Sequence, residues 1–513
     1  MPRRNILFIV LDQFRADLIS GALAAHAKLP NISAFRREAV TFLDHFTVVN
    51  PCGPSRASLL TGQYAMNHRS VRNGTPLGRE KPNLALEMRK AGYEPLLFGY
   101  TDTTQDPRGM HPADPALRSY ELPLPGFTEV VEMRLESGSL PWRAYLRNKG
   151  YDLPAYERFY DPVPPGSARP PRPDDPPFYG AEDSDTAFLT TRFIEEIGER
   201  AHVGWFAMLN YIRPHPPLVA PEPYNRMFDP AAMPAPAGHA TPEEEEAAHP
   251  FMRVQRAYNL TGSYVRGAAS ASDSSPDDAR LLRALYLGLA AEVDAHLGRV
   301  FAHLKATGEY DDTLIILTAD HAEMLGDHWS WGKFHYFDPA WRIPLIIRDP
   351  AAPEQSGTVV RAFTESIDIA PTILDYAGRQ PPAGMDGRSL RGFLRGDPPE
   401  SWREFVHMEL DFGEPDKPTK AQKALGLSLE EARFAILRGK RWKLVHFPAL
   451  PPLLFDLRDD PDELHNLAED SAHAPVLLRM TQALLGHRIK HMDKTLTGMR
   501  ATPDGMYGYD PLA

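Results

Sequence analysis

Unbroken runs of apolar, mostly branched residues mark the buried strands of this chain. Residues 6–11 form one such run, and residues 313–318 and 344–347 form two more. Such runs are typical of parallel strands that are covered on both faces. Segments with helical spacing lie between them: residues 29–42 predict a short helix followed by a strand, and residues 278–304 repeat apolar side chains at helical intervals. The alternation predicts an α/β sandwich.

The pattern changes at about residue 397. Short strands are predicted at 434–437, 442–445 and 453–457, and a helix follows at about 474–492. This order predicts a smaller antiparallel sheet with a helix packed on it. We therefore expect a larger domain over residues 1–396 and a smaller C-terminal α+β subdomain with a tail over residues 397–513.

Two segments of the larger domain are expected on the surface. Residues 162–177 contain eight prolines, which exclude a helix or a central strand, and we expect a surface insertion over about 107–185. A run of four glutamates at 243–246 is predicted to be a solvated face without a function.

Composition narrows the class of protein. At 513 residues, the chain exceeds the roughly 250–300 residues at which a single core stops growing. A net charge of −12 without a basic stripe argues against a nucleic-acid partner. One cysteine excludes an intrachain disulfide and favours a reducing compartment. The first apolar run is too short for a signal peptide, and no run approaches a membrane span, so we expect a cytoplasmic protein without a membrane partner.

The single cysteine is the first candidate for chemistry. Cys52 stands in the sequence PCGPSRASLLTG, in which Pro54 suits the start of a helix and Gly62 its end. Free N–H groups at a helix start favour an anion, and Arg56 can face the same anion one turn later. A lone cysteine is otherwise most often a small apolar filler. The spacing to Arg56 is too short for a Cys-x5-Arg phosphatase loop.

Two pairs of candidate metal ligands end predicted buried strands. Asp12 and Gln13 follow the first apolar run, and Asp320 and His321 follow the second. In open α/β sheets, the site lies beyond the carboxyl ends of the strands. Oxygen ligands with one imidazole suit Ca²⁺, Mn²⁺ or Mg²⁺. Taken alone, an aspartate at a strand end is more often a cap or a turn residue.

Two further polar residues follow apolar segments. His215 lies between prolines in the sequence RPHPP, which keeps its backbone extended after the apolar run at 205–209. Lys333 stands on a predicted loop shortly after the Asp320 pair. A lone histidine is usually structural and a loop lysine usually solvated, so both alternatives stay open on residue type alone.

With these residues assembled, the chain resembles the formylglycine-dependent sulfatases of the alkaline phosphatase superfamily over nearly its whole length. The spacing Cys-x-Pro-Ser-Arg carries this resemblance. Within the family, the chain is most similar to bacterial phosphonate monoester hydrolases and related arylsulfatases. Segments 210–217, 363–368, 446–452 and 491–497 carry that closer similarity.

The resemblance implies an alkaline-phosphatase-like sandwich, with a large mixed central sheet flanked by helices, and a set of residue roles. Cys52 is oxidised to formylglycine by a formylglycine-generating enzyme, and Asp12, Gln13, Asp320 and His321 hold one divalent metal, Ca²⁺ or Mn²⁺. Arg56 steadies the hydrated aldehyde, and His215 and Lys333 contact the substrate anion or the leaving oxygen. Tyr100 matches a substrate-contacting tyrosine, and Asp102 stands at a substrate position where phosphonate hydrolases have a threonine.

The implied function is hydrolysis of small monoanionic esters, such as aryl sulfates and phosphonate monoesters, through a covalent hemiacetal ester. A dianionic phosphate monoester would more naturally use two metals, and the sequence offers ligands for one. The resemblance also implies a homo-oligomer. Two alternatives stay open: a non-catalytic anion-binding protein with unmodified Cys52, and a phosphodiesterase with sulfatase side activity.

Overall fold

The apolar runs form the centre of an eight-stranded sheet. The computed structural model describes residues 4–166, 169–200, 204–256, 264–266, 275–494 and 496–507. The strands of this sheet are β1 (Asn5–Leu11), β2 (Val40–Phe42), β4 (Pro95–Gly99), β5 (Thr128–Glu132), β6 (Phe206–Tyr211), β7 (Thr313–Ala319), β8 (Leu345–Arg348) and β9 (Val359–Val360). Their order is β5-β4-β6-β1-β7-β8-β2-β9. The first five are mutually parallel, whereas β8 is antiparallel to both β7 and β2, so the predicted mixed central sheet is confirmed.

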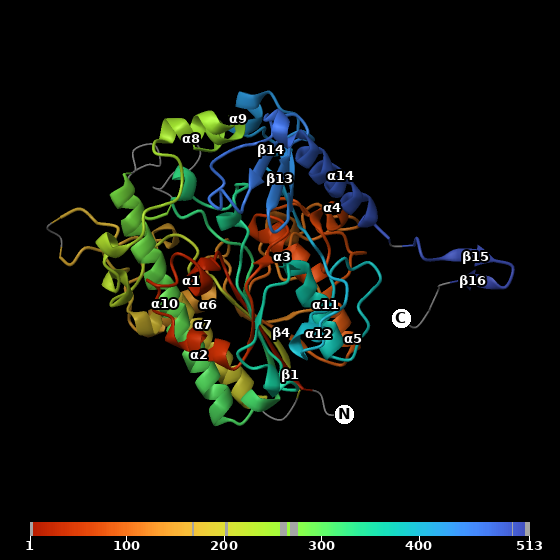
Figure 1. Ribbon diagram of the computed structural model, residues 1–513. Helices are drawn as coiled ribbons and strands as arrows, with labels where there is room; N and C mark the ends of the chain where they lie inside the picture. The colour runs from red at the N-terminus through yellow and green to blue at the C-terminus, as the bar shows by residue number, and fades with distance from the viewer. Residues whose placement is uncertain are drawn as a thin grey trace.

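Helices cover both faces of this sheet (Figure 1). One face is covered by α2 (Pro30–Arg37), α7 (Asp185–Glu199) and α10 (Pro276–Ala306), and the other by α3 (Cys52–Thr61), α5 (Leu84–Lys90) and α11 (Ile369–Tyr376). Alternate residues of β1 enter the two cores, Leu7 and Ile9 on the first side and Phe8 and Val10 on the second. This two-sided burial is the reason that the strand is apolar throughout.

The C-terminal part contains a separate antiparallel sheet with a helix on one face, as predicted. Its strands are β11 (Val406–Asp411), β12 (Arg433–Arg438), β13 (Trp442–His446) and β14 (Leu453–Asp456), and the helix is α14 (Ala474–Lys490). Leu437, Leu444 and Leu454 pack against Met480 and Leu484 of the helix. The predicted boundary at 396/397 falls between α12 (Arg391–Leu394) and β11 and stays a prediction.

The remaining elements are short. They are α1 (Asp17–Ser20), α4 (Ala65–His68), α6 (Leu140–Asn148), α8 (Pro242–Ala248), α9 (Pro250–Arg256), α13 (Lys420–Leu425), and the paired strands β3 (His45–Phe46) and β10 (Thr364–Glu365). Among the described residues, no helix combines the length and the apolar content needed to cross a membrane.

The segment expected as a surface insertion, about 107–185, contributes more than surface. Its strand β5 forms the edge of the central sheet beside β4. Trp142 of α6 is fully buried in the core that also holds α7 and α10. The proline-rich stretch within it contains no helix or strand among its described residues. Surface character is therefore confined to parts of this segment.

The glutamate run also differs from the prediction of a wholly solvated face. Residues 243–246 lie in α8, and Glu245 is buried, with its Oε1 2.9 Å from His328 Nδ1. The His328 ring stacks on Phe337, with ring centroids 3.4 Å apart. The helix thus points one of the four glutamates, Glu245, into the protein, where its carboxylate pairs with the His328 imidazole.

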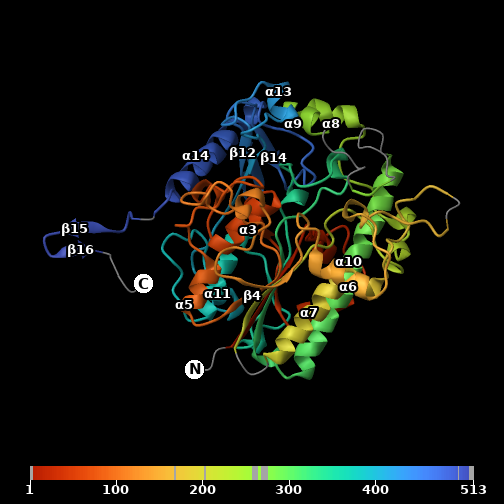
Figure 2. The same cartoon turned by 180° about the vertical axis from the view of Figure 1, so that it is seen from behind.

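A hairpin stands clear of the body in both views (Figures 1 and 2). It consists of β15 (Arg500–Thr502) and β16 (Gly505–Tyr507), and it follows α14 along the chain. Leu496 and Tyr507 are about 70% and 71% exposed. The outer face of α14 is also apolar, because Leu485 and Ile489 are exposed there.

Candidate active site

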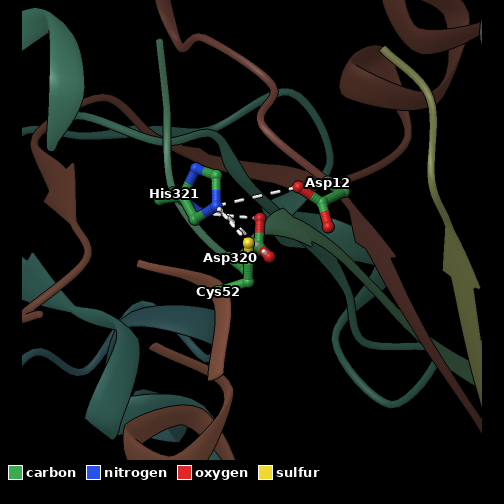
Figure 3. Close-up of side chains that lie close together, drawn as sticks. All are labelled: Asp12, Cys52, Asp320 and His321. Carbon is green, nitrogen blue, oxygen red and sulfur yellow. Dashed lines mark hydrogen bonds and ion pairs between the residues drawn. The ribbon is translucent and has the colours of Figure 1, made fainter. Parts of the chain in front are cut away.

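The polar residues at the ends of two neighbouring strands meet the start of α3 (Figure 3). Asp12 follows β1 and Asp320 follows β7, and the last residues of these strands are paired in register. Asp12, Cys52, Asp320 and His321 each offer one ligand atom, and these atoms lie within 4.8 Å of one another. Cys52 Sγ is 3.1 Å from His321 Nε2. The rule that parallel strands gather polar residues at their carboxyl ends therefore holds here.

Helix α3 presents Cys52 from its first turn. The helix begins at Cys52 itself, two residues earlier than Pro54 suggests, and Gly62 closes it with a φ of 66° in the left-handed region. Every residue of the helix is buried. The thiol therefore lies at a helix N-terminus, where free N–H groups favour an anion.

The donor set fits a divalent cation. His321 Nδ1 lies 3.1 Å from the carbonyl oxygen of Ala322 and donates to it, which leaves the Nε2 lone pair directed at the carboxylates. Asp12 Oδ1 and Asp320 Oδ2 are buried, and among the described residues neither accepts a hydrogen bond. Burial and then the neighbouring Asp12 raise the pKa of Asp320 to about 6. A cation between these carboxylates would relieve their repulsion and satisfy their free oxygens.

Arg56 is fully buried and faces three carboxylates. Its Nη2 lies 3.1 Å from both Asp12 Oδ2 and Asp320 Oδ2, and its Nε lies 3.4 Å from Asp102 Oδ2. Nη1 donates to Asn210 Oδ1 at 3.1 Å. Each nitrogen of the guanidinium fork thus has a different partner, which a lysine could not reproduce.

Lys333 and His215 form a second group of contacts near the thiol. Lys333 Nζ is 3.1 Å from Cys52 Sγ, 2.9 Å from Gln13 Oε1 and 3.3 Å from His215 Nε2. Burial and then the Lys333 charge hold the pKa of His215 down at about 4, so its imidazole is neutral at pH 7. Burial raises the pKa of the Cys52 thiol above its ordinary value, so the unmodified residue is a poor nucleophile.

The contacts of Gln13 differ from those expected of a side chain that only binds a metal. Its amide oxygen accepts from Lys333, and its amide nitrogen donates to Glu323. Its backbone N–H donates to Asp320 Oδ1 at 3.1 Å, which fixes the Asp320 side chain. The structure therefore shows Gln13 orienting two other site residues, and its role as a metal ligand stays a prediction.

Tyr100 and Asp102 flank Arg56. The Tyr100 hydroxyl donates to Asp12 Oδ2 at 2.6 Å, and its ring lies 4.3 Å from the Arg56 guanidinium carbon. Asp102 is buried, with a φ of 49°, and burial raises the pKa of its carboxyl group. Both residues line the same cavity as Cys52.

That cavity, of about 100 Å³, is also lined by residues that the sequence reasoning missed. They are Asn73, Tyr120, Glu121, Leu135 and Ile212. Asn73 Oδ1 accepts from the backbone N–H of Gly53 at 2.9 Å and so anchors the loop beside Cys52. Asn210, the partner of Arg56, could have been found, since it lies near the carboxyl end of β6 beside β1. The others lie on loops without a periodic pattern.

Comparison with known proteins agrees with this geometry. The family described as Sulfatase matches residues 4–379. The chain belongs to the sulfatase family. The family described as N-sulphoglucosamine sulphohydrolase, C-terminal, matches residues 326–490, which include the smaller sheet. The predicted resemblance is thereby confirmed.

Individual relatives match almost end to end. The multifunctional alkaline phosphatase superfamily protein PehA of Trinickia caryophylli is 41% identical, with 99% of each chain covered. A solved phosphonate monoester hydrolase from Silicibacter pomeroyi is 53% identical and has a TM-score of 0.95, covering 99% of this chain and 100% of that one. The phosphonate monoester hydrolase of Agrobacterium radiobacter is 43% identical, with the same TM-score and the same coverage.

Proposed function

We propose that this sulfatase-family chain hydrolyses small monoanionic esters, namely sulfate and phosphonate monoesters, with a divalent metal and a formylglycine made from Cys52. The observation that carries the proposal is the contact of Cys52 Sγ with both Lys333 Nζ and His321 Nε2, at 3.1 Å each, at the edge of the carboxylate cluster. Family membership and the near-complete match to phosphonate monoester hydrolases support it.

The charges of the site favour a substrate with one negative charge. Two cationic side chains, Arg56 and Lys333, and a divalent ion would face the carboxylates of Asp12, Asp320 and Asp102. These charges leave a small net positive charge for the ester. A doubly charged phosphate monoester would be better matched by two metals, and among the described residues one group of ligands suits a metal.

In this proposal, the side chains of the protein hold the reacting groups in place. The bound metal and the hydrated aldehyde supply the chemistry. The metal, held by Asp12, Asp320 and His321 with Gln13 beside them, would supply Lewis acidity, and the hydrated aldehyde at Cys52 would supply the nucleophilic hydroxyl. Arg56 fixes the orientation of two carboxylates. Lys333, which donates to Gln13, is placed to donate to the leaving oxygen, and neutral His215 is placed to exchange the proton with it.

The test is a parallel rate comparison on one enzyme preparation, with an aryl sulfate and an aryl phosphonate monoester that share their leaving group. Because the solved relatives with 53% and 43% identity are phosphonate monoester hydrolases, we expect turnover of both esters and a preference for the phosphonate. A preference for the sulfate would make the chain an arylsulfatase. Absence of turnover with both, in protein whose intact mass shows the aldehyde at Cys52, would overturn the proposal.

We also propose that the chain forms a homo-oligomer through its C-terminal arm, defined here as residues 496–507. An isolated two-stranded hairpin is at best marginally stable in water, so β15–β16 needs a partner surface. Its exposed Met506 and Tyr507, and the exposed Leu485 and Ile489 of α14, supply apolar area for a second copy.

A further inference from the structure

Part of the active-site cavity has no place in the proposed chemistry. Its lining includes Asp102, Tyr120, Glu121, Leu135 and Ile212, together with Cys52. Leu135 and Ile212 are apolar, but two of the remaining residues are carboxylates. An anion-hydrolysing site gains nothing from extra negative charge beside its nucleophile, so these two groups need a separate explanation.

Asp102 is the first of them. Its side chain is only 5% exposed, and among the described residues it makes no hydrogen bond. Its one charged contact is with Arg56 Nε at 3.4 Å, and Arg56 already pairs with Asp12 and Asp320. A buried carboxylate with such incomplete partners costs free energy unless a ligand completes its shell.

Glu121 is the second. It is 4% exposed and lines the cavity, and its Oε2 accepts the backbone N–H of Glu136 at 2.8 Å. That bond holds the carboxylate in place but brings no positive charge. Arg134, the arginine whose charge acts on Glu121, already pairs with Glu129 and Glu132.

The cavity lining therefore contains charges of both signs. Lys333 lies beside Cys52, Gln13 and His215, whereas Glu121 is tied to the backbone of a different segment around Glu136. The Tyr100 ring already lies against the Arg56 guanidinium, whereas Tyr120 lines the same space and can face a cation. Positive charge for the ester anion and negative charge for another group thus share one small volume.

We infer that the substrate is a zwitterionic ester whose alcohol carries a positive charge, and that Asp102 and Glu121 bind this charge. The inference rests on the proposed function and names the substrate class for the same site. With a cavity of about 100 Å³, the alcohol is a short ammonium-bearing chain of a few carbons. Carboxylates with aromatic faces are the usual means of binding such a group.

The test compares two sulfate esters of the same shape. One is trimethylammonioethyl sulfate, and the other replaces its trimethylammonium group with a neutral tert-butyl group. The measured quantity is the ratio of the two kcat/KM values in the natural protein, in Glu121→Gln and in the control Glu157→Gln. Glutamine keeps the size of Glu121 and removes its charge, whereas Glu157 carries equal charge at an exposed position outside the cavity lining.

We expect the natural protein and the control to favour the cationic ester and Glu121→Gln to lower the ratio about tenfold, since an uncompensated charge is worth that much or more. Comparing ratios cancels the difference in leaving-group reactivity. An unchanged ratio in Glu121→Gln would overturn the inference and make Glu121 a loop anchor. An aryl sulfate assayed alongside separates this result from failure of the proposed function, because that failure would abolish its turnover too.

Discussion

At the scale of single residues, the site depends on groups that each serve several others. The Arg56 guanidinium bonds to Asn210, faces three aspartates and lies over the Tyr100 ring. The Gln13 side chain joins Lys333 to Glu323. Loss of such a residue leaves several buried charges unpaired, so its effect on activity will exceed that of one hydrogen bond.

Cys52→Ser tests the chemistry at the nucleophile. We expect the variant to fold as the natural protein does and to show no sustained turnover. A serine hydroxyl can accept the sulfuryl or phosphonyl group, but it lacks the second hydroxyl needed to release it. Product formation should stop at or below one equivalent of enzyme in a quenched time course. Continuous turnover by this variant would contradict the proposed use of formylglycine.

The charge of Glu121 gives a pH prediction. Burial, opposed in part by hydrogen bonds from the backbone of Glu136 and Leu135, raises the pKa of Glu121 to about 7. The charged groups around it are Glu136, Arg134 and Asp102. The carboxylate is anionic above this pKa. The preference for the cationic ester should therefore increase between about pH 6 and about pH 8, which is roughly one unit on either side of the pKa.

The control for this prediction is Glu121→Gln, in which the preference should be flat over the same range. A preference in the natural protein that does not change with pH would show that Glu121 does not titrate in the enzyme. The neutral ester, measured in the same series, corrects for every other pH effect on the rate.

The site residues that could be predicted from the sequence are those at the ends of strands and those in the cysteine motif. Asp12, Cys52, Asp320 and His321 come together because parallel strands end at one edge of the sheet. Asn73, Tyr120 and Glu121 could not be inferred in this way. They reach the cavity on loops whose course depends on tertiary packing, and no local spacing records that course.

At the scale of elements, burial on both faces made the central strands easy to predict. Strand β11 was missed although its sequence VHMELD alternates apolar and polar residues, which is the pattern of a half-buried strand. Its polar face is buried as well, and Glu409 on that face pairs with Arg488 of α14. Strand β5 falls inside the segment predicted as a surface insertion, and in the structure only Val131 among its residues is buried.

Helix α8 gives a stability prediction at this scale. Burial disfavours the charge of Glu245, but the hydrogen bond to His328 outweighs this effect and lowers the pKa of Glu245. The substitution Glu245→Gln weakens this buried, charge-assisted hydrogen bond. The free energy of unfolding should therefore fall by about 1.5–3 kcal/mol. Urea unfolding measures this change.

The matched control is Glu243→Gln, which removes an exposed charge from the same run. It should change the free energy of unfolding by less than about 0.5 kcal/mol. Equal effects of the two substitutions would mean that the buried pair contributes nothing beyond the helix itself. Since a carboxylate with a lowered pKa stabilises the fold above its unfolded pKa, the natural protein should lose this contribution as the pH falls through the folded value.

At the scale of the whole molecule, the C-terminal arm can be removed without touching the site. The helix α14 packs on β12 and β13, and the arm lies beyond it (Figure 2). We expect a chain that ends at residue 494, which keeps the contacts of His491 with Asn67 and of Asp493 with Lys81, to keep the thermal stability of the dilute natural protein. Its mass in solution, measured by light scattering, should be lower than that of the full chain. An unchanged assembly would contradict the proposed interface.

The single cysteine makes chemical modification of this protein unusually simple to quantify. Because Cys52 is the sole sulfhydryl in 513 residues, a maleimide added to unfolded protein would label only unconverted molecules. An aminooxy fluorophore would label only molecules that carry the aldehyde. The two labelled fractions must sum to one, so every specific activity can be expressed per converted molecule. A preparation with partial conversion then becomes a calibration series rather than a source of error.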